Sequence, residues 1–391
     1  MSQPFCLLRL ACYNGFKGED KMSNFSYHFE QRLGFMNDPN GCVYFGGRWH
    51  TFFQYHEAGR NTTTWWGHAV SDDLLTWEEL PPALKHEPNS PYEEFGCLSG
   101  SSIVKDGRLY LFYTSATAQK HQSISLAYTD DGVNFEKHPS NPIVPCPDFV
   151  YEHNFRDPKV FLYDGKYYML VGAEFDRLGR ILCYISEDLV SWSYASEFYV
   201  SDKYEPYPSI TLECPDFFPL GDRWVLKFSS QHHRKEIFVL GKFDGKAFTP
   251  ETSETLLDGG EHLYAMQTFA NVSDRTVMLG WMWSWEKPLT PGYETRTGTM
   301  CIPREFWLHD GKIYSYPVKE AQALLKQESK FVKLDGTTVT VLGKDGKSVL
   351  VRDMRECNGV REIERVDILE DSDAVEIFIN GGEASITQWL I

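Results

Sequence analysis

Three acidic residues of this chain, Asp38, Asp157 and Glu213, each lie nine or ten residues before a basic residue that ends a short turn. Each is followed by proline, either directly or two residues later. One Asp-Pro pair ordinarily marks only a turn, but three acids at nearly the same position of three similar segments indicate a site. Two carboxylates that flank a glycosidic bond can hydrolyse it, because one attacks the anomeric carbon while the other protonates the leaving oxygen. A third carboxylate can hydrogen-bond the sugar hydroxyls.

The turns belong to an internal repeat. A basic residue ends each of them, at Arg48, Arg108, Lys166, Arg223 and Arg275. These positions are separated by 60, 58, 57 and 52 residues, and a strand-like run, aromatic in most copies, follows each one. Self-similarity at a nearly fixed period is the sequence signature of repeat architectures. If the five copies form a ring, the three carboxylates meet.

A second motif follows within each of the first four copies. It joins a hydroxyl residue, acids and an aromatic residue six positions on, at 71–77, 129–135 and 186–192, with a shorter version at 243–248. Because an acidic turn between two β-runs is typical of hairpins, each copy is expected to hold four antiparallel strands. Such units repeated radially form a β-propeller. The sequence therefore predicts an all-β chain with a five-bladed β-propeller and a short C-terminal β-sandwich-like module.

The repeat also predicts the domain boundaries. We expect a disordered extension over 1–22, the propeller over 23–317, a linker over 318–329 with a short helix near 318–327, and a truncated C-terminal β-module over 330–391. A unit of about 60 residues buries little surface. The module is therefore expected to pack against the propeller.

Composition and charge limit the function classes. The net charge of −17 argues against a nucleic-acid partner, since phosphate binding requires an excess of Lys and Arg on one face. A run of about 18 apolar residues is absent from the sequence, so no membrane span is expected. Nine scattered cysteines without a Cys-x-x-Cys spacing fit reduced thiols and a cytoplasmic location. The histidines near the acids lack ligand spacing, so neither a metal nor a cofactor is expected, and His28 and His68 are expected to support the site from strands.

Several longer motifs occur along the chain in a fixed order: Phe35-Met-Asn-Asp-Pro-Asn-Gly41, Phe53-Gln-Tyr55, Trp66-Gly-His-Ala-Val-Ser-Asp-Asp-Leu74, Ser99-Gly-Ser101, Phe155-Arg-Asp-Pro158, Glu213-Cys-Pro-Asp216, Gly280-Trp-Met282, Pro303-Arg-Glu305 and Val375-Glu-Ile-Phe-Ile-Asn380. In these motifs the chain resembles glycoside hydrolase family 32, which includes β-fructofuranosidases, invertases and sucrose-6-phosphate hydrolases. The resemblance covers almost the whole chain after Met22.

The resemblance implies a role for each matching residue. Asp38 corresponds to the nucleophile, Glu213 to the acid/base and Asp157 to the transition-state stabiliser. The positions that contact the fructosyl unit or shape its pocket correspond to Asn37, Gln54, Ser99, Arg156 and Trp285. Cys214 is expected to be structural, filling a tight turn. Where the family usually has an acid, this chain has His262, which is expected to change the charge or the specificity of the site.

The resemblance implies a retaining β-fructofuranosidase that forms a fructosyl-enzyme on sucrose, sucrose 6-phosphate or a short fructo-oligosaccharide. Its partner would be a small carbohydrate, and the chain would be a monomer or homodimer. Two alternatives remain. One is an inverting pentosidase on the same fold, with carboxyl groups roughly 6.5 to 9.5 Å apart instead of about 5 to 5.5 Å. The other is a sugar-binding propeller that has lost turnover.

Overall fold

The regular secondary structure of the described chain is almost entirely β-strand. A computed structural model describes residues 25–57, 62–201, 211–283 and 296–391, and in these residues it contains 28 strands and two short 3-10 helices. Within this part of the chain no helix is both long enough and apolar enough to cross a membrane. The predicted extension over 1–22 lies outside the described residues.

Five antiparallel sheets follow one another along the described chain between residues 34 and 317. The first contains β1 (Gly34–Phe45), β2 (Arg48–His56), β3 (Trp65–Ser71) and β4 (Trp77–Leu84), and β20 (Arg296–Thr297) pairs in parallel with β1. The second contains β5 (Gly96–Lys105), β6 (Arg108–Ala116), β7 (Gln122–Thr129) and β8 (Glu136–Lys137). The third contains β9 (Phe155–Tyr163), β10 (Lys166–Phe175), β11 (Leu178–Ser186) and β12 (Ser193–Val200).

The fourth and fifth sheets complete the series. The fourth contains β13 (Leu212–Leu220), β14 (Arg223–Ser230), β15 (Lys235–Phe243), β16 (Phe248–Pro250) and β17 (Thr255–Leu256). The fifth contains β18 (Leu263–Thr268), β19 (Thr276–Met282), β21 (Arg304–His309) and β22 (Lys312–Pro317). Each basic turn predicted from the sequence immediately precedes or begins the second strand of its sheet, which confirms the repeated hairpins.

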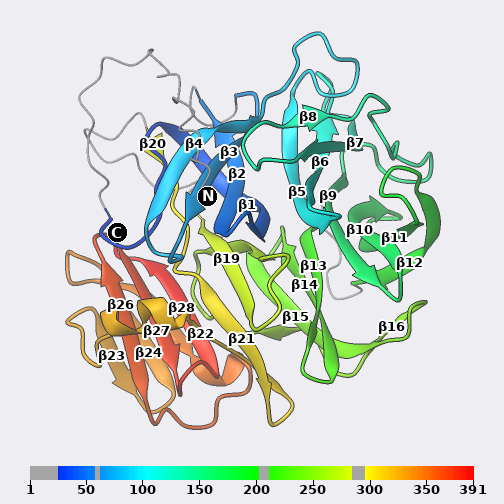
Figure 1. Cartoon of the computed structure of the whole chain (residues 1–391). Helices are drawn as coiled ribbons and strands as arrows, with labels where there is room; N and C mark the ends of the chain where they lie inside the picture. Colours follow the sequence, from blue (N-terminus) through cyan, green and yellow to red (C-terminus); the bar gives the residue numbers. More distant parts are fainter. Residues whose placement is uncertain (1–24, 58–61, 202–210, 284–295) are drawn as a thin grey trace, which may run out of the picture.

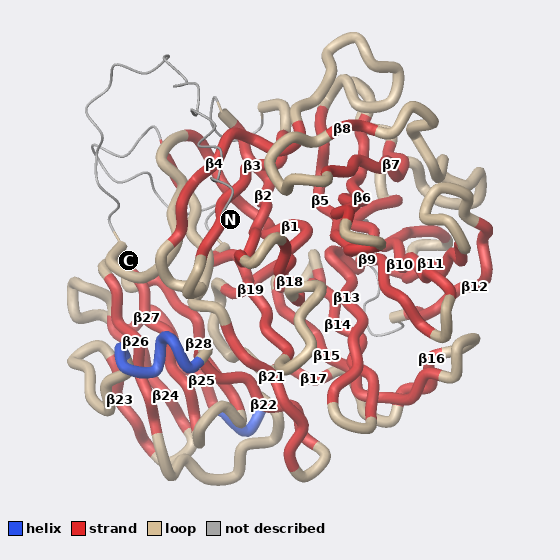
Figure 2. Tube along the Cα trace, in the orientation of Figure 1, coloured by secondary structure: helices blue, strands red, loops and turns tan. Residues whose placement is uncertain are grey.

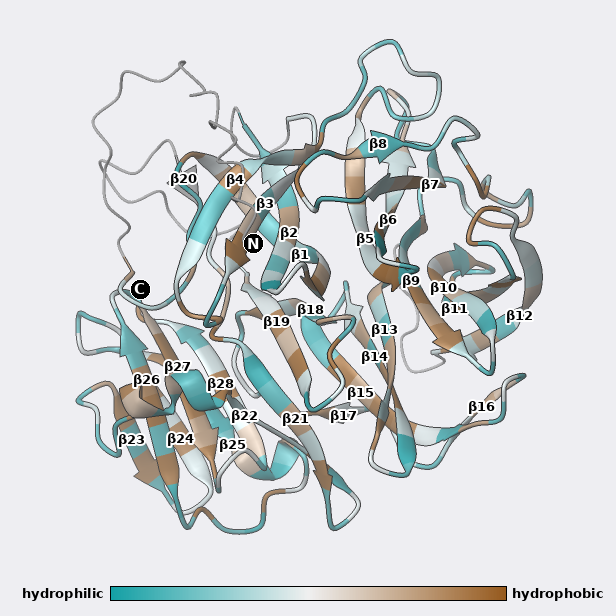
Figure 3. Cartoon of the chain, in the orientation of Figure 1, coloured by the Kyte–Doolittle hydropathy of each residue, from teal (hydrophilic) through white to brown (hydrophobic). Residues whose placement is uncertain are grey.

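The first strands of the five sheets contact one another in cyclic order. β1 contacts β5, β5 contacts β9, β9 contacts β13, β13 contacts β18, and β18 contacts β1 again. The sheets therefore radiate around these strands (Figures 1 and 2). Aromatic rings meet across each of the five interfaces, in the pairs Trp66–Tyr113, Phe112–Trp192, Phe161–Phe217, Phe238–Phe306 and Phe35–Trp281. Apolar residues lie mainly along the strands, whereas the outer connections are mostly hydrophilic (Figure 3).

Each of these first strands carries a β-bulge near its start. The pairing register shifts at Asn37-Asp38, Ser99, Asp157-Pro158, Cys214-Pro215 and Ala265-Met266. Three bulge residues have a left-handed backbone, with φ of 61° at Asp157, 47° at Cys214 and 55° at Ala265. A bulge inserts an unpaired residue and re-aims the neighbouring side chains. The five bulges therefore decide which side chains the first strands direct to this end of the ring.

The C-terminal part begins with a short connection. The predicted helix near 318–327 is a 3-10 helix, η1 (Lys319–Leu324), and is shorter than expected. One three-stranded sheet follows, with β23 (Val332–Asp335), β24 (Thr338–Leu342) and β25 (Ser348–Asp353), and then the second 3-10 helix, η2 (Met354–Glu356). The other three-stranded sheet contains β26 (Val366–Asp371), β27 (Ala374–Ile379) and β28 (Ala384–Trp389). Residues of both sheets share one apolar core.

A buried charge network joins β27 and β28 to the fifth sheet. Arg304, only 1% exposed, pairs with Asp258 at 3.2 Å and with Glu376 at 2.5 Å. His28 bridges Glu376 and Asp371 at 2.9 Å each. Burial alone would lower the pKa of His28, but the hydrogen bonds and charges of the two acids outweigh it and raise the pKa to about 9. The prediction that His28 supports the carboxylate site is therefore wrong, because two acids of the C-terminal sheet bind both of its ring nitrogens.

Replacing Arg304 by Met should destabilise the protein by roughly 3 kcal/mol, since breaking a buried pair leaves an uncompensated charge. Arg304→Met keeps the apolar stem but removes the cation between Asp258 and Glu376. Urea unfolding measures the change. Arg355→Met is the matched control, because Arg355 pairs with Asp353 on the surface with its side chain 67% exposed, and its unfolding midpoint should match that of the wild type. Equal unfolding midpoints for both variants would contradict the proposed contribution of the buried charge network to stability.

Candidate active site

The three acids predicted from the sequence lie around one cysteine. The Cys214 thiol lies 3.7 Å from Asp38 Oδ2 and 3.7 Å from Asp157 Oδ2, and its backbone N–H donates to Asp157 Oδ2 at 2.9 Å. Glu213 directly precedes it in β13. The contacts between sheets therefore bring together residues that are 57 positions apart, as Asp157 and Cys214 are, and 176 positions apart, as Asp38 and Cys214 are. Burial raises the pKa of the Cys214 thiol well above its usual value, so the thiol stays neutral, as a structural residue in a tight turn should.

Asp38 accepts hydrogen bonds from three side chains. Ser99 Oγ donates at 2.8 Å, Gln54 Nε2 at 3.1 Å and Asn37 Nδ2 at 3.2 Å. The Gln54 amide also contacts Ser99 Oγ, and His56 Nε2 lies 3.2 Å from Asn37 Oδ1. Three of the predicted sugar-contacting residues thus orient one carboxylate. Each has a polar atom close enough to the acid to reach a ligand bound there.

Glu213 has a different surrounding. Tyr264 OH donates to its Oε2 at 2.5 Å, and Gln231 Nε2 donates to its Oε1 at 3.1 Å. The Arg156 guanidinium lies 3.1 Å from the same Oε1. Burial raises the pKa of Glu213, whereas Arg156 and the Tyr264 hydrogen bond lower it and the Asp38 charge raises it further. The balance is a raised pKa, which suits a carboxyl group that must hold a proton.

Asp157 is the most buried of the three acids, with 4% exposed. Its backbone N–H donates to Thr114 Oγ1 at 2.8 Å, which fixes the left-handed turn. Burial raises the pKa of Asp157 to about 6, although the Arg156 charge acts in the opposite direction. Arg156 therefore contacts Glu213 and also stabilises the negative charge of Asp157.

Two buried lysines contact the first strands at or next to the bulges. Lys227 Nζ donates to the carbonyl oxygens of Cys214 at 3.3 Å and Met266 at 2.5 Å, and it pairs with Glu236 at 2.8 Å. Lys159 pairs in the same way with Asp216, at 2.7 Å. These contacts hold neighbouring first strands together beneath the acids.

Sequence reasoning missed the roles of Tyr264, Gln231 and Lys227. Tyr264 lies at the start of the fifth repeat, which has no acid at the position equivalent to the three acids. The repeat therefore did not indicate a role for Tyr264. Gln231 and Lys227 lie in β14 or just after it, outside the positions that the repeat singled out. The pairing of β13 with β14 brings Lys227 to Cys214 and Gln231 to Glu213, whereas the contact between the fourth and fifth sheets brings Tyr264 to Glu213.

Two other positions predicted from the sequence, Trp285 and His262, have no described contact with the three acids. Trp285 lies outside the described residues. His262 contacts Trp389 of β28, with its Nδ1 3.4 Å from the Trp389 backbone nitrogen, and burial lowers the pKa of His262 to about 4. A neutral imidazole held against the C-terminal strand adds no charge to the three acids.

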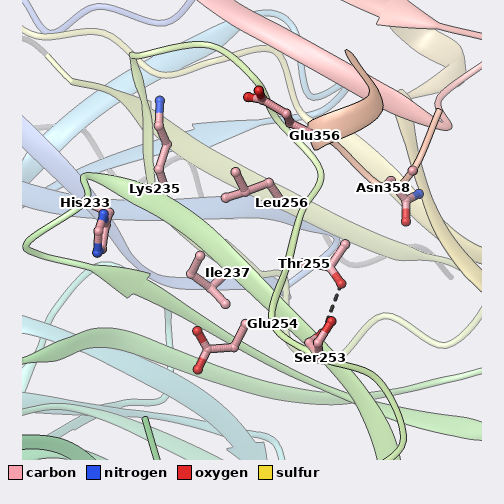
Figure 4. A pocket seen from close by; sticks show the side chains of 10 residues that line it. His233, Lys235, Ile237, Ser253, Glu254, Thr255, Leu256, Glu356 and Asn358 are labelled. Atoms are coloured by element: carbon pink, nitrogen blue, oxygen red, sulfur yellow. Dashed lines mark hydrogen bonds between the residues drawn. The ribbon is translucent and has the colours of Figure 1, made fainter. Parts of the chain in front are cut away.

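A cleft of about 600 Å³ lies beside the fourth sheet (Figure 4). His233, Lys235 and Glu254 line it from the fourth sheet and its connections, and Glu356 and Asn358 line it from the C-terminal part. Its ten lining residues include none of the three clustered acids. Lys235 is occupied by an ion pair with Glu261 at 2.8 Å.

Comparison with known proteins decides the family. Residues 28–317 match the model of the glycosyl hydrolases family 32 N-terminal domain. The chain belongs to glycosyl hydrolase family 32. Its relatives in family 32 include a sucrose-6-phosphate hydrolase of Zymomonas mobilis, 34% identical over 334 residues, which cover 77% of this chain and 63% of that protein. A raffinose invertase of Escherichia coli is 30% identical over 427 residues, covering 92% of this chain and 88% of that one.

A solved family 32 structure has the same fold. The beta-fructofuranosidase of Bombyx mori superposes with a TM-score of 0.77 at 27% identity, over 94% of this chain and 89% of that one. These family 32 neighbours are β-propellers. The chain spans a little under two thirds of the length of its Zymomonas mobilis relative.

Asp38→Asn should change how stability depends on pH. Burial and the neighbouring Asp157 raise the pKa of Asp38 from 3.8 to about 6. The folded state thus binds this proton more tightly than the unfolded state, and the stability it contributes is complete below pH 4 and lost as the pH rises through about 6. Asparagine cannot ionise, so the variant does not lose this stability. The free energy of unfolding of the variant minus that of the wild type should therefore increase by on the order of 1 to 2 kcal/mol between pH 4 and 7, after allowing for solvent screening.

Urea unfolding at pH 4 to 8 measures this difference, with Asp188→Asn as the control. Burial raises the pKa of Asp188, but several backbone and side-chain hydrogen bonds together outweigh it and lower this pKa to about 2. Its contribution is present above its unfolded pKa and is lost only at lower pH, so the control difference should stay flat over this range. A flat difference for Asp38→Asn as well would contradict the raised pKa.

Proposed function

We propose that the chain is a retaining β-fructofuranosidase that hydrolyses sucrose, sucrose 6-phosphate or short fructo-oligosaccharides. The observation that carries the proposal is the convergence of Asp38 and Glu213 in unlike surroundings. The names of the family 32 relatives support the substrate class. The small carbohydrate is the proposed partner, and the monomer or homodimer state and the cytoplasmic location stay predictions.

The architecture is part of this proposal. We take the five sheets to be the five blades of a propeller over 23–317, because their first strands contact one another in a closed cycle. The two three-stranded sheets over 330–391 would form a small sandwich, which their shared core supports. Residues 318–329 would be the linker. In this arrangement the carboxylates lie at one end of the propeller axis.

The proposed reaction has two displacements at the anomeric carbon. Asp38 attacks this carbon and forms the fructosyl ester, while the bond to the leaving oxygen breaks and Glu213 gives that oxygen its proton. Ionised Glu213 then takes a proton from water, whose oxygen attacks the same carbon and releases Asp38. Three donors at Asp38 hold the attacking carboxylate in place. Asp157 and Arg156 would bind sugar hydroxyls as positive charge develops on the ring.

Asp38→Ala should lower fructose release on the order of 10⁴-fold or more, because no other group can form the ester. Fructose is measured with sucrose, sucrose 6-phosphate and a short inulin in parallel. Asp72→Ala is the control, since Asp72 is an exposed acid that pairs with Arg48 in the same sheet, and it should keep full turnover. Unchanged turnover in Asp38→Ala would refute the assignment.

The same assays separate the alternatives. Proton NMR of the first product should show β-fructofuranose, because two displacements retain configuration. An α product would indicate an inverting enzyme. Sucrose binding by calorimetry without any turnover in the wild type would indicate a sugar-binding protein.

Tyr264→Phe should move the alkaline limb of the kcat/KM profile to higher pH. The Tyr264 hydroxyl donates to Glu213 and lowers its pKa. A hydrogen bond to a charged group contributes about 1.5–3 kcal/mol, so the limb should shift by about one to two pH units. Tyr113→Phe removes a similar buried bond, to Glu93, and should leave both limbs in place. An alkaline limb that does not move would exclude Glu213 as the titrating acid.

A further inference from the structure

Three ligand-type side chains meet at the junction of the second and third sheets. His121 lies just before β7, and Glu152 and His153 lie in the segment that leads into β9. One ligand atom from each lies within 4.8 Å of the others. His121 Nε2 is 2.8 Å from Glu152 Oε1, and His153 Nε2 is 4.0 Å from the same oxygen.

The backbone orients these side chains. His153 Nδ1 lies 3.2 Å from the carbonyl oxygen of Lys120. A carbonyl can only accept, so Nδ1 carries a hydrogen. In the neutral ring the lone pair is then on Nε2, the nitrogen that lies 4.0 Å from Glu152 Oε1. A backbone carbonyl that binds the second ring nitrogen is the usual partner of a metal-binding histidine. The Gln122 N–H donates to the Glu152 carbonyl at 2.9 Å, which ties the two segments together.

Charge also favours a cation here. The cluster has one carboxylate and two imidazoles, and the Lys120 ammonium lies over the Phe95 ring at 4.9 Å. The net charge of −17 adds a general attraction for cations. A His121–Glu152 ion pair alone would hold the two segments, but it would not require the Nε2 of His153 to face the same oxygen.

We propose that His121, Glu152 and His153 form a binding site for a divalent transition-metal ion of the Zn²⁺ type. Two imidazole nitrogens and one carboxylate oxygen are a common three-ligand set for Zn²⁺, with the fourth position open to water. Imidazole ligands also disfavour Mg²⁺ and Ca²⁺, which prefer oxygen. A closure of about 1 to 2 Å by these exposed side chains would bring their ligand atoms to coordination distances, roughly 2.0–2.2 Å from the ion.

The proposed ion would lie at the edge of the carboxylate site. Arg156 Nη1 donates to the backbone carbonyl of His153 at 3.4 Å, and Arg156 pairs with Glu213. The ion would therefore fix the segment around His153, whose backbone carbonyl accepts a hydrogen bond from the Arg156 guanidinium. Sequence spacing could not reveal this site, because His121 lies 31 residues before Glu152 and only the contact between neighbouring sheets joins them.

Calorimetric titration of the full chain with Zn²⁺, in a buffer that does not chelate, tests the proposal. The variants are His121→Ala, His153→Ala and Glu152→Gln. Each should lose one equivalent of bound Zn²⁺ relative to the wild type, or bind it about tenfold more weakly or worse. His309→Ala is the matched control, because His309 is an exposed histidine 3.6 Å from one acid, Asp310, and it should bind as the wild type does.

Two further measurements make the result decisive. Binding of Zn²⁺ to cysteine thiols is the same in the wild type, the three variants and the control, so the difference in bound Zn²⁺ between proteins identifies the proposed site. Thermal melting without metal checks that each variant is folded. The wild-type minus His153→Ala difference spectrum with Co²⁺ should show the visible absorption of a site with nitrogen and oxygen ligands, and excess Mg²⁺ should not remove it. Equal Zn²⁺ stoichiometry and affinity in wild type and variants, or no difference spectrum, would overturn the proposal.

Discussion

The β-bulge in the first strand of each sheet is the constraint on which the carboxylate site depends. A regular strand turns successive side chains to opposite faces, and here both faces pack against neighbouring sheets. The bulge adds one residue and lets the chain direct polar groups to the end of the ring. Its left-handed residues, Asp157 and Cys214, cost on the order of 1–3 kcal/mol each. Buried hydrogen bonds offset part of this cost: the Asp157 N–H donates to Thr114 Oγ1, and Lys227 Nζ donates to the Cys214 carbonyl.

Bringing three acids together opposes folding, and the surrounding charges limit that cost without removing it. The pKa values of Asp38 and Asp157 rise to about 6 because burial outweighs their hydrogen bonds. Arg156 lies between Asp157 and Glu213 and favours the ionised form of both. Donors also differ among the acids, since hydroxyl and amide groups bind Asp38 whereas a guanidinium and a phenol bind Glu213. This difference in donors supports the proposed roles, in which Asp38 attacks and Glu213 carries a proton.

The repeat made the three acids predictable, because a shared period places residues at related positions of related strands. Their positions are nevertheless not identical: Asp38 is the second residue of its bulge, Asp157 is the first, and Glu213 directly precedes its bulge. Side chains that act across sheets were not predictable. Tyr264 reaches Glu213 from another repeat, and His28 was assigned to the wrong place because its partners lie about 345 residues away. Such pairings depend on tertiary register, which one sequence does not contain.

The C-terminal sheets contribute to the site through packing. Trp389 Nε1 of β28 donates to the carbonyl of Trp283 at 2.8 Å, and the Trp283 ring meets the Tyr264 ring edge-on at 5.0 Å. Tyr264 in turn donates to Glu213. These contacts join two elements that are rigid for separate reasons, the buried charge network around Arg304 and the bulge of β18. This path of packed rings and hydrogen bonds therefore links the position of the Tyr264 hydroxyl to the C-terminal sheets.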